Sequence, residues 1–193
     1  MSPAPIPESA ILQPACEEEW EAWLESHEEA TEVWLKLGKK GCPHPSITYA
    51  QALEVAICFG WIDGQIRGLD EHFTLRRFTP RRPRSKWSQI NREHVAQLTA
   101  AGRMRARGLA EVEAAKADGR WDAAYAPAST IAVPDDLRAA LDAHPPAAAF
   151  FETLTGSDRY AFLYRLHHVT DAERRRQRIE DYIQRLSAGK TLG

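Results

Sequence analysis

Apolar and polar positions follow two different periods along this chain, and the change of period separates predicted helices from predicted strands. Residues 17–27 carry apolar side chains at the spacing of one helical face. Three glutamates open this segment, where the positive end of the helix dipole favours acidic side chains. Residues 32–37 instead alternate strictly, with Val33, Leu35 and Leu37 on one side. A helix followed by a half-buried strand is therefore expected.

Two further alternating segments, residues 61–67 and 72–79, predict an antiparallel hairpin. A four-residue loop between them sets Asp63 opposite Arg76 and leaves one apolar face and one polar face. Opposite charges that face each other across two strands stabilise a sheet. Because a slip of one residue would reverse the faces, the apolar pattern favours this register.

Helices are predicted for most of the remaining chain. Thr48 begins one of them, with Gln51 placed to complete a capping box. Another is expected to run from about Ser85, its predicted N-cap, to Ala101. Residues 127–193 are expected to be wholly helical. Their four predicted helices cover residues 134–144, residues 145–154, a segment from Ser157 past His167, and residues 171–188.

These elements predict an α+β fold that is mostly helical, with a small antiparallel sheet and an all-helical C-terminal part. The predicted strands are residues 32–37, 61–67 and 72–79. The 193 residues suffice for one full-sized domain. The expected organisation is a Pro-rich flexible arm at 1–15, an α+β core at 16–126, and a helical region at 127–193 that packs on the core as one compact unit.

Composition narrows the class of protein. Apolar residues at 44% and charged residues at 27% are typical of a packed globular chain. A net charge of −2 argues against wholesale binding to nucleic acid, which relies on neutralising many phosphates. Cys16, Cys42 and Cys58 lack the paired spacing of zinc sites, and neither GxGxxG nor GxxxxGK[ST] occurs. We therefore expect small buried or half-buried thiols, and we assign no metal and no cofactor.

The N-terminal sequence MSPAPIPESAILQP shows no basic segment followed by an apolar run, which a signal peptide would have. No stretch approaches the roughly 20 apolar residues that a membrane-spanning helix needs. A cytoplasmic protein without membrane insertion is therefore expected.

Several short segments carry a resemblance to a known family. They are Gly60–Gly64, Pro80–Arg82, Ser85–Ser88 with Asn91, Gly102–Met104 and Gly119–Trp121. With them the chain resembles the YdeI/OmpD-associated (bacteriocin-protection) family, from about Glu17 to the final basic helix. The resemblance implies a role in resistance to bacteriocins or antimicrobial stress. It implies no established catalytic mechanism.

The C-terminal part departs from the family pattern. Val169-Thr170 stands where the family usually has an Ala-Lys pair, and Glu173–Arg175 replaces a Glu-Thr-Arg run, whereas Arg178-Ile179 is retained. Any role that the family gives to that lysine or threonine therefore does not carry over.

The sharpest functional signal is a run of cations between the hairpin and the helix expected at Ser85. Its members are Arg76, Arg77, Arg81, Arg82, Arg84, Lys86 and Arg92. A helix N-terminus already carries positive partial charge and free N–H donors, so cations gathered there favour a bound anion. Pro80 and Pro83 stiffen the loop, which lowers the entropy lost on binding.

We therefore predict a site for a small phosphate- or carboxylate-bearing ligand on this loop and the polar face of the hairpin. Trp87 would supply a flat apolar wall, the Ser85 hydroxyl would meet the anion, and Asn91 would point to the same loop from one turn further on. The predicted ligand-binding residues are Trp61, Asp63, Arg76, Arg81, Arg84, Ser85, Lys86, Trp87 and Asn91. No residue is assigned as catalytic.

Three alternatives stay open. The glutamates between Glu17 and Glu32 would turn the cation cluster into a structural salt-bridge network. An enzyme, a hydrolase or transferase on an anionic substrate, would place Asp63 and Asn91 in the pocket, although an aspartate paired with arginine is a weak general base. A nucleic-acid-binding module would use the loop together with the basic helix at 174–185. That helix lacks the aromatic platforms of single-strand binders, which favours a solvated face there.

Overall fold

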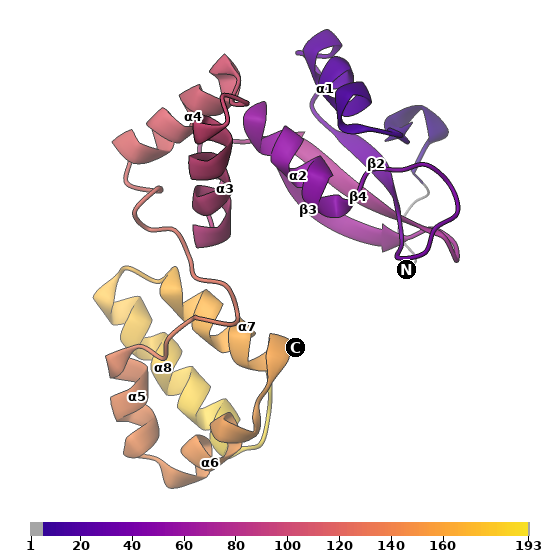
Figure 1. Ribbon diagram of the computed structural model, residues 1–193. Helices are drawn as coiled ribbons and strands as arrows, with labels where there is room; N and C mark the ends of the chain where they lie inside the picture. Colours follow the sequence, from indigo (N-terminus) through magenta and orange to yellow (C-terminus); the bar gives the residue numbers. More distant parts are fainter. Residues whose placement is uncertain (1–5, 193) are drawn as a thin grey trace. The chain divides into compact units, whose positions relative to one another are not determined.

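The computed structural model describes residues 6–192 and confirms an α+β chain that is mostly helical. The chain divides into two compact units (Figure 1). Unit 1 comprises the residues up to Trp87 together with Asn91–Ala124, and unit 2 comprises Ser88–Ile90 together with the residues from Tyr125 onward. The chain passes from unit 1 into unit 2 for the last time after Ala124, two residues before the predicted boundary between residues 126 and 127. The predicted packing of both regions into one unit stays a prediction.

Unit 1 contains a four-stranded sheet in the order β1-β2-β4-β3. Its strands are β1 (Ile11–Leu12), β2 (Val33–Gly38), β3 (Trp61–Gly68) and β4 (Phe73–Pro80). The last three are the predicted strands, and they pair antiparallel. β1 pairs parallel with β2 and makes the sheet mixed. It was not predicted, because two residues are too few to show an alternation. It falls in the predicted arm, of which residues 1–5 lie outside the described residues.

The predicted register of the hairpin is wrong. Asp63 faces Phe78 instead of Arg76, and after an irregularity in β3 it is Ile66 that faces Arg76. The connecting loop explains part of the difference, because the Asp70 carboxylate accepts two backbone N–H groups from the end of the loop, both at 2.8 Å. This local capping sets where β4 begins, and an irregularity inside a strand leaves no trace in the alternation of side chains.

One face of the sheet carries the core of unit 1. The helices α1 (Glu17–Ser26) and α2 (Tyr49–Cys58) contribute to the same buried cluster as β2 and β4. Trp20 of α1 is fully buried, and its ring meets that of Phe78 edge-on at 5.9 Å between centroids. The predicted capping box is present at Thr48, so the start of α2 is confirmed.

Two more helices, α3 (Gln89–Ala100) and α4 (Ala106–Ala117), complete unit 1. Gly108 of α4 lies against the last turn of α2: a Cβ atom at this position would be only 2.2 Å from the carbonyl oxygen of Cys58. The same carbonyl accepts the backbone N–H of Arg105 at 3.1 Å. The two helices therefore approach so closely that only a residue without a side chain fits between them.

Unit 2 is the predicted all-helical region. Its helices are α5 (Asp135–Asp142), α6 (Pro145–Thr153), α7 (Gly156–His167) and α8 (Ala172–Ser187). Each lies close to a predicted helix. Phe151, Phe162 and Tyr182 are buried in its separate core, where the rings of Phe162 and Tyr182 meet edge-on at 4.8 Å.

Arg175 at the start of α8 ties three segments of unit 2 together. Its Nη1 donates to the carbonyl of Leu166 at 2.8 Å, and its Nη2 donates to the Asp136 carboxylate at 3.0 Å. The hydrogen bond from Arg175 holds the pKa of Asp136 below its ordinary value. Among the helices of residues 6–192, none has the length and apolar character needed to cross a membrane.

The short segment Ser88–Ile90 is grouped with unit 2 although its neighbours on both sides belong to unit 1. Ser88 forms an isolated parallel bridge with Tyr125, and the backbone N–H of Gln89 donates to the Tyr125 carbonyl at 2.9 Å. The chain therefore enters unit 2 twice.

Candidate functional site

The arginine-rich loop lies between β4 and α3, and its helix begins later than predicted. α3 starts at Gln89, so the prediction that Ser85 is its N-cap is wrong. The Ser85 hydroxyl instead accepts the backbone N–H of Arg82 at 2.9 Å, and the Ser85 N–H donates to the Arg82 carbonyl at 2.8 Å. A serine side chain that bonds its own loop competes with helix formation. Ser85 thus closes a turn in the loop, four residues before the helix.

A cation–π ladder fixes the loop to the rest of unit 1. The Arg81 guanidinium lies 3.5 Å from the centroid of the Trp87 ring, and Arg81 Nη1 donates to the Lys86 carbonyl at 3.2 Å. The Trp87 ring meets the Trp121 ring at 5.0 Å between centroids, and the Arg92 guanidinium lies 5.2 Å from the centroid of the Trp121 ring. Arg81 and Trp87 are both buried, at 6% and 1% exposure. These two predicted site residues therefore anchor the loop.

The exposed cations of the loop are Arg82, Arg84 and Lys86. Partial burial lowers the pKa of the Lys86 amine, because desolvation disfavours its charged form. Within the described residues, no carboxylate lies within 4 Å of the guanidinium groups of Arg82 and Arg84. The loop thus presents a positive surface on a fixed backbone.

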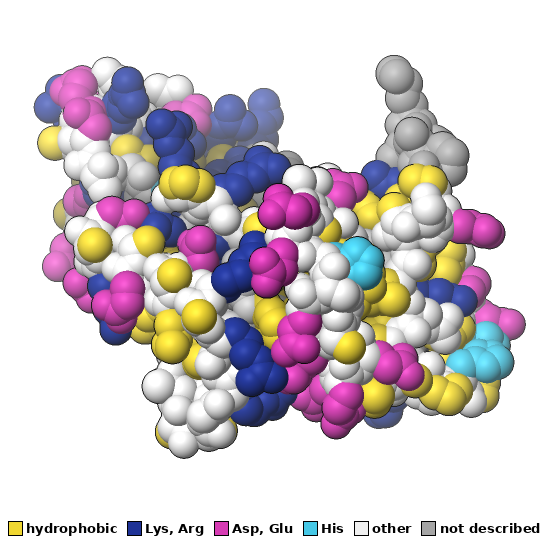
Figure 2. All heavy atoms as spheres, turned by 90° about the horizontal axis from the view of Figure 1, so that it is seen from above, with side chains coloured by type: hydrophobic (Ala, Val, Ile, Leu, Met, Phe, Trp, Pro, Cys, Tyr) yellow, Lys and Arg dark blue, Asp and Glu magenta, His cyan; other side chains and the backbone are white. Residues whose placement is uncertain are grey.

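The alternative of a salt-bridge network with the glutamate-rich segment holds for Arg77, which pairs with Glu32. The glutamates of α1 pair with residues that precede α4 instead. Arg103 meets Glu17 at 2.6 Å, and Arg105 meets Glu21 at 3.0 Å. Figure 2 shows acidic and basic side chains interleaved on the face that it presents.

Asp63 of β3 and Arg76 of β4 form a second group, on the sheet. Arg76 Nη1 donates to the Asp63 carboxylate at 2.9 Å, so the predicted pair is in contact although the register is different. Tyr49 completes the group: its hydroxyl donates to the same carboxylate oxygen at 2.9 Å, and the Arg76 guanidinium lies 4.2 Å from its ring. Tyr49 was missed because no local spacing connects it with the hairpin.

The two remaining predicted site residues are buried. Trp61 has 1% exposure and meets the rings of Trp20 and Trp23 edge-on, at 6.1 and 6.0 Å. Asn91, in the first turn of α3, has 8% exposure. The structure therefore brings together Arg81, Ser85, Lys86 and Trp87 in the loop, with Arg84 exposed beside them, whereas Trp61 belongs to the core of unit 1.

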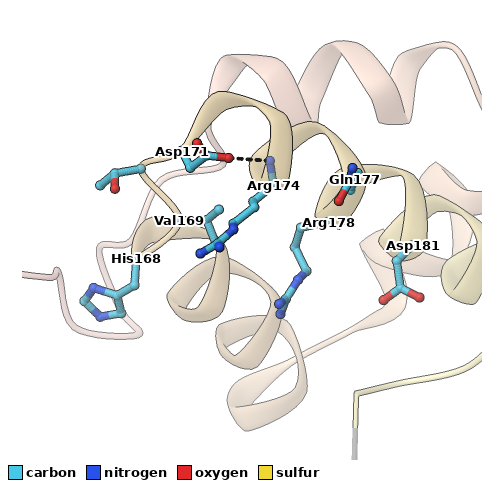
Figure 3. A pocket seen from close by; sticks show the side chains of 8 residues that line it. His168, Val169, Asp171, Arg174, Gln177, Arg178 and Asp181 are labelled. Carbon is cyan, nitrogen blue, oxygen red and sulfur yellow. Dashed lines mark hydrogen bonds between the residues drawn. The ribbon is translucent and has the colours of Figure 1, made fainter.

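Unit 2 contains a hollow of about 510 Å³ between the end of α7 and the outer side of α8 (Figure 3). Its lining consists of His168, Val169, Thr170, Asp171, Arg174, Gln177, Arg178 and Asp181. Arg174 and Arg178 are one helical turn apart and extend to the same side of α8. The sequence showed them as part of a basic face, but the concavity arises from the turn between α7 and α8, which no spacing reveals.

Comparison with known families gives two matches that follow each other along the chain. The domain of unknown function DUF8412 matches residues 12–111, which is more than half of the chain. The family described as "Bacteriocin-protection, YdeI or OmpD-Associated" matches residues 130–189, within unit 2. Among curated proteins and solved structures nothing matches. The segments from Gly60 to Met104 that carry the resemblance lie in the first match, and the hollow lies in the second.

The chain therefore belongs to the family of the DUF8412 domain, and its residues 130–189, in unit 2, match the family described as "Bacteriocin-protection, YdeI or OmpD-Associated".

Proposed function

We propose that the chain is a binding protein for a small phosphate- or carboxylate-bearing ligand, with a role in protection against bacteriocins or antimicrobial stress. The family match supports the protective role. The observation that carries the binding function is the pair Arg82 and Arg84, two exposed guanidinium groups without a carboxylate within 4 Å among residues 6–192. Other arginines of unit 1, such as Arg76 and Arg103, are ion-paired.

The fixed backbone of the loop favours binding. The turn closed by Ser85 and the stacking of Arg81 on Trp87 hold the loop, and Arg120 Nη1 donates to the Ser85 carbonyl at 3.1 Å. A loop that is already ordered loses less conformational entropy when a ligand binds. Guanidinium groups form paired hydrogen bonds with the oxygens of phosphates and carboxylates. The proposed ligand contacts are therefore the exposed cations of the loop, and the stacking of Arg81 on Trp87 holds the loop backbone in place.

We also propose a cytoplasmic location. Cys16, Cys42 and Cys58 are all free thiols, which fits a reducing compartment. The enzyme and nucleic-acid alternatives stay predictions. For the enzyme, Asp63 is held by both Arg76 and Tyr49, which leaves it poorly placed to accept a proton from a substrate.

Isothermal titration calorimetry with inorganic phosphate, a nucleoside monophosphate and citrate tests the proposal. The variant R82Q/R84Q is expected to raise Kd by about tenfold and at most about 30-fold, since each of the two exposed charged contacts is worth up to about 1 kcal/mol. R138Q with K190Q, two exposed cations outside the loop, removes the same charge and should leave Kd unchanged. Equal affinity in R82Q/R84Q and the original protein, or no binding of any probe, would refute the proposal for the loop.

A further inference from the structure

We infer that the hollow of unit 2 is a second binding site, which takes a small phosphomonoester, and that it works independently of the loop before α3. The independence of this site from the loop follows from the lining of the hollow, because every lining residue comes from one continuous stretch, residues 168–181. Arg174 and Arg178 point into it from successive turns of α8 (Figure 3). Two guanidinium groups thus lie on one wall of a concave surface.

The arginines of α8 divide into those that hold the structure and those that do not. Arg175 bonds the Leu166 carbonyl and Asp136, Arg176 pairs with Glu173, and Arg185 pairs with Asp181. For Arg174 and Arg178, no carboxylate of the described residues lies within 4 Å of the guanidinium group. The two cations that face the hollow are therefore the ones without an acidic partner within that distance.

The acidic side chains of the hollow are engaged elsewhere. The Asp171 carboxylate accepts the backbone N–H of Arg174 at 2.8 Å and so caps α8. The Asp181 carboxylate accepts Arg185 Nε with both oxygens, at 3.1 and 3.0 Å. Burial raises the pKa of Tyr182, and a side-chain hydrogen bond with Arg178 together with the Arg178 charge partly offsets that rise. Tyr182 is neutral, so this contact brings no negative charge to Arg178.

The position of Arg174 also costs stability in the absence of a ligand. It is the third residue of α8, and the positive end of the helix dipole disfavours a cation there. No carboxylate among residues 6–192 lies within 4 Å of the Arg174 guanidinium to offset this cost, whereas Arg175 and Arg176 have acidic partners. A bound anion would offset it, so the arrangement favours a ligand with several negative oxygens.

The number of donors favours phosphate over carboxylate. One guanidinium group already saturates the two oxygens of a carboxylate, whereas a phosphomonoester has three terminal oxygens and a charge of about −1.5 to −2 at neutral pH. Two guanidinium groups match that charge. The geometry therefore assigns the phosphoryl group to the wall formed by Arg174 and Arg178.

The hollow is larger than a phosphate ion. Its volume of about 510 Å³ lies in the range of about 300–1,000 Å³ that small-molecule sites occupy. His168 and Val169 form its less polar side, and the His168 ring is backed edge-on by Tyr164 at 4.6 Å. Gln177 also lines the hollow. The ligand therefore carries an organic body on its phosphate.

Calorimetry on the full chain tests this site with inorganic phosphate, ribose 5-phosphate and AMP, and with ribose and adenosine as matched compounds without phosphate. The phosphate esters should bind and the compounds without phosphate should not. In R174Q/R178Q the Kd for the esters should rise at least about 30-fold. R82Q/R84Q removes the same charge from the loop, and in this variant the Kd and the heat of ester binding at the hollow should be unchanged.

Two further measurements keep the outcome unambiguous. R174K/R178K keeps the positive charge but loses the paired donors of the guanidinium groups, so it should recover only part of the affinity for the esters. If R174Q/R178Q does not fold, the Kd of R174K/R178K tests the site in its place. Without ligand, R174Q alone should raise the melting temperature of unit 2 by about 1 °C.

Four results would overturn the inference: no binding of any ester, equal binding of the compounds without phosphate, unchanged Kd in R174Q/R178Q, or loss of all binding in R82Q/R84Q. The last result would leave the loop proposal standing. Binding lost in R174Q/R178Q alone would support the hollow and refute the loop.

Discussion

The close approach of α4 to α2 gives the sharpest test of the fold of unit 1. In Gly108→Ala, the new Cβ would lie 2.2 Å from the Cys58 carbonyl oxygen and 2.8 Å from the Ile57 carbonyl oxygen. Carbon–oxygen contacts below 3.0 Å are essentially never seen for real Cβ atoms. Both neighbours are backbone atoms, so no side chain can turn aside. The helices must separate by about 1 Å, which also strains the hydrogen bond from Arg105 to Cys58.

The magnitude follows from two opposing effects. Overpacking of this kind costs about 3 kcal/mol at the upper end of its usual range, and alanine is about 1 kcal/mol better than glycine inside a helix. The expected net loss is about 2 kcal/mol in the free energy of unfolding. For a unit of this size that corresponds to a fall of roughly 6–10 °C in melting temperature.

Tryptophan fluorescence measures this change in unit 1 alone, because all six tryptophans lie before Ala124. Two controls separate the clash from helix propensity. Gly68→Ala has no atom within 4 Å of the new Cβ and should be nearly neutral. Ala110→Gly, on the exposed side of α4, should cost about 1 kcal/mol. A Gly108→Ala protein as stable as the original would refute the close packing of these two helices.

Two more predictions concern single groups. Because the hydrogen bond from Arg175 lowers the pKa of Asp136, this pair stabilises unit 2 above the ordinary aspartate pKa near 4, and the contribution is lost as the pH falls through the lowered value. Asp136→Asn should therefore flatten the loss of unit 2 stability between about pH 5 and 3, measured by circular dichroism, and an unchanged acid profile would contradict this. Burial raises the pKa of Cys58 to about 11, so in the native protein a disulfide reagent should modify exposed Cys16 and half-buried Cys42 quickly and Cys58 only on unfolding. Fast reaction of three thiols would show that α2 is more open than described.

Much of unit 1 follows from local patterns in the sequence. The alternation around Leu35 predicts a half-buried strand, and Thr48 with Gln51 predicts the capping box that begins α2. Both signals act over a few residues, so neighbouring structure does not override them. The start of α3 could not be predicted in the same way. Ser85 is a good N-cap by type, but its hydroxyl is used by the turn with Arg82.

The candidate sites depended on contacts between residues far apart in sequence. The run of loop cations is visible in the sequence, but only the structure shows that Arg81 is buried on Trp87 while Arg82 and Arg84 stay exposed. In α8 the adjacent residues Arg174 and Arg175 are both arginines, so the sequence alone does not distinguish their roles. Their roles differ because the helix directs one toward the hollow and the other toward Asp136.

The bridge between Ser88 and Tyr125 limits how this protein can be divided into fragments or combined with parts of related proteins. A fragment that ends at Ala124 would lack the carbonyl that accepts the Gln89 amide, and a fragment that begins at Tyr125 would lack the segment that Tyr125 pairs with. No single cut separates the units cleanly. Exchange of either unit between relatives would therefore have to transfer Ser88–Ile90 as well, and it should succeed only where these three residues and Tyr125 come from the same protein.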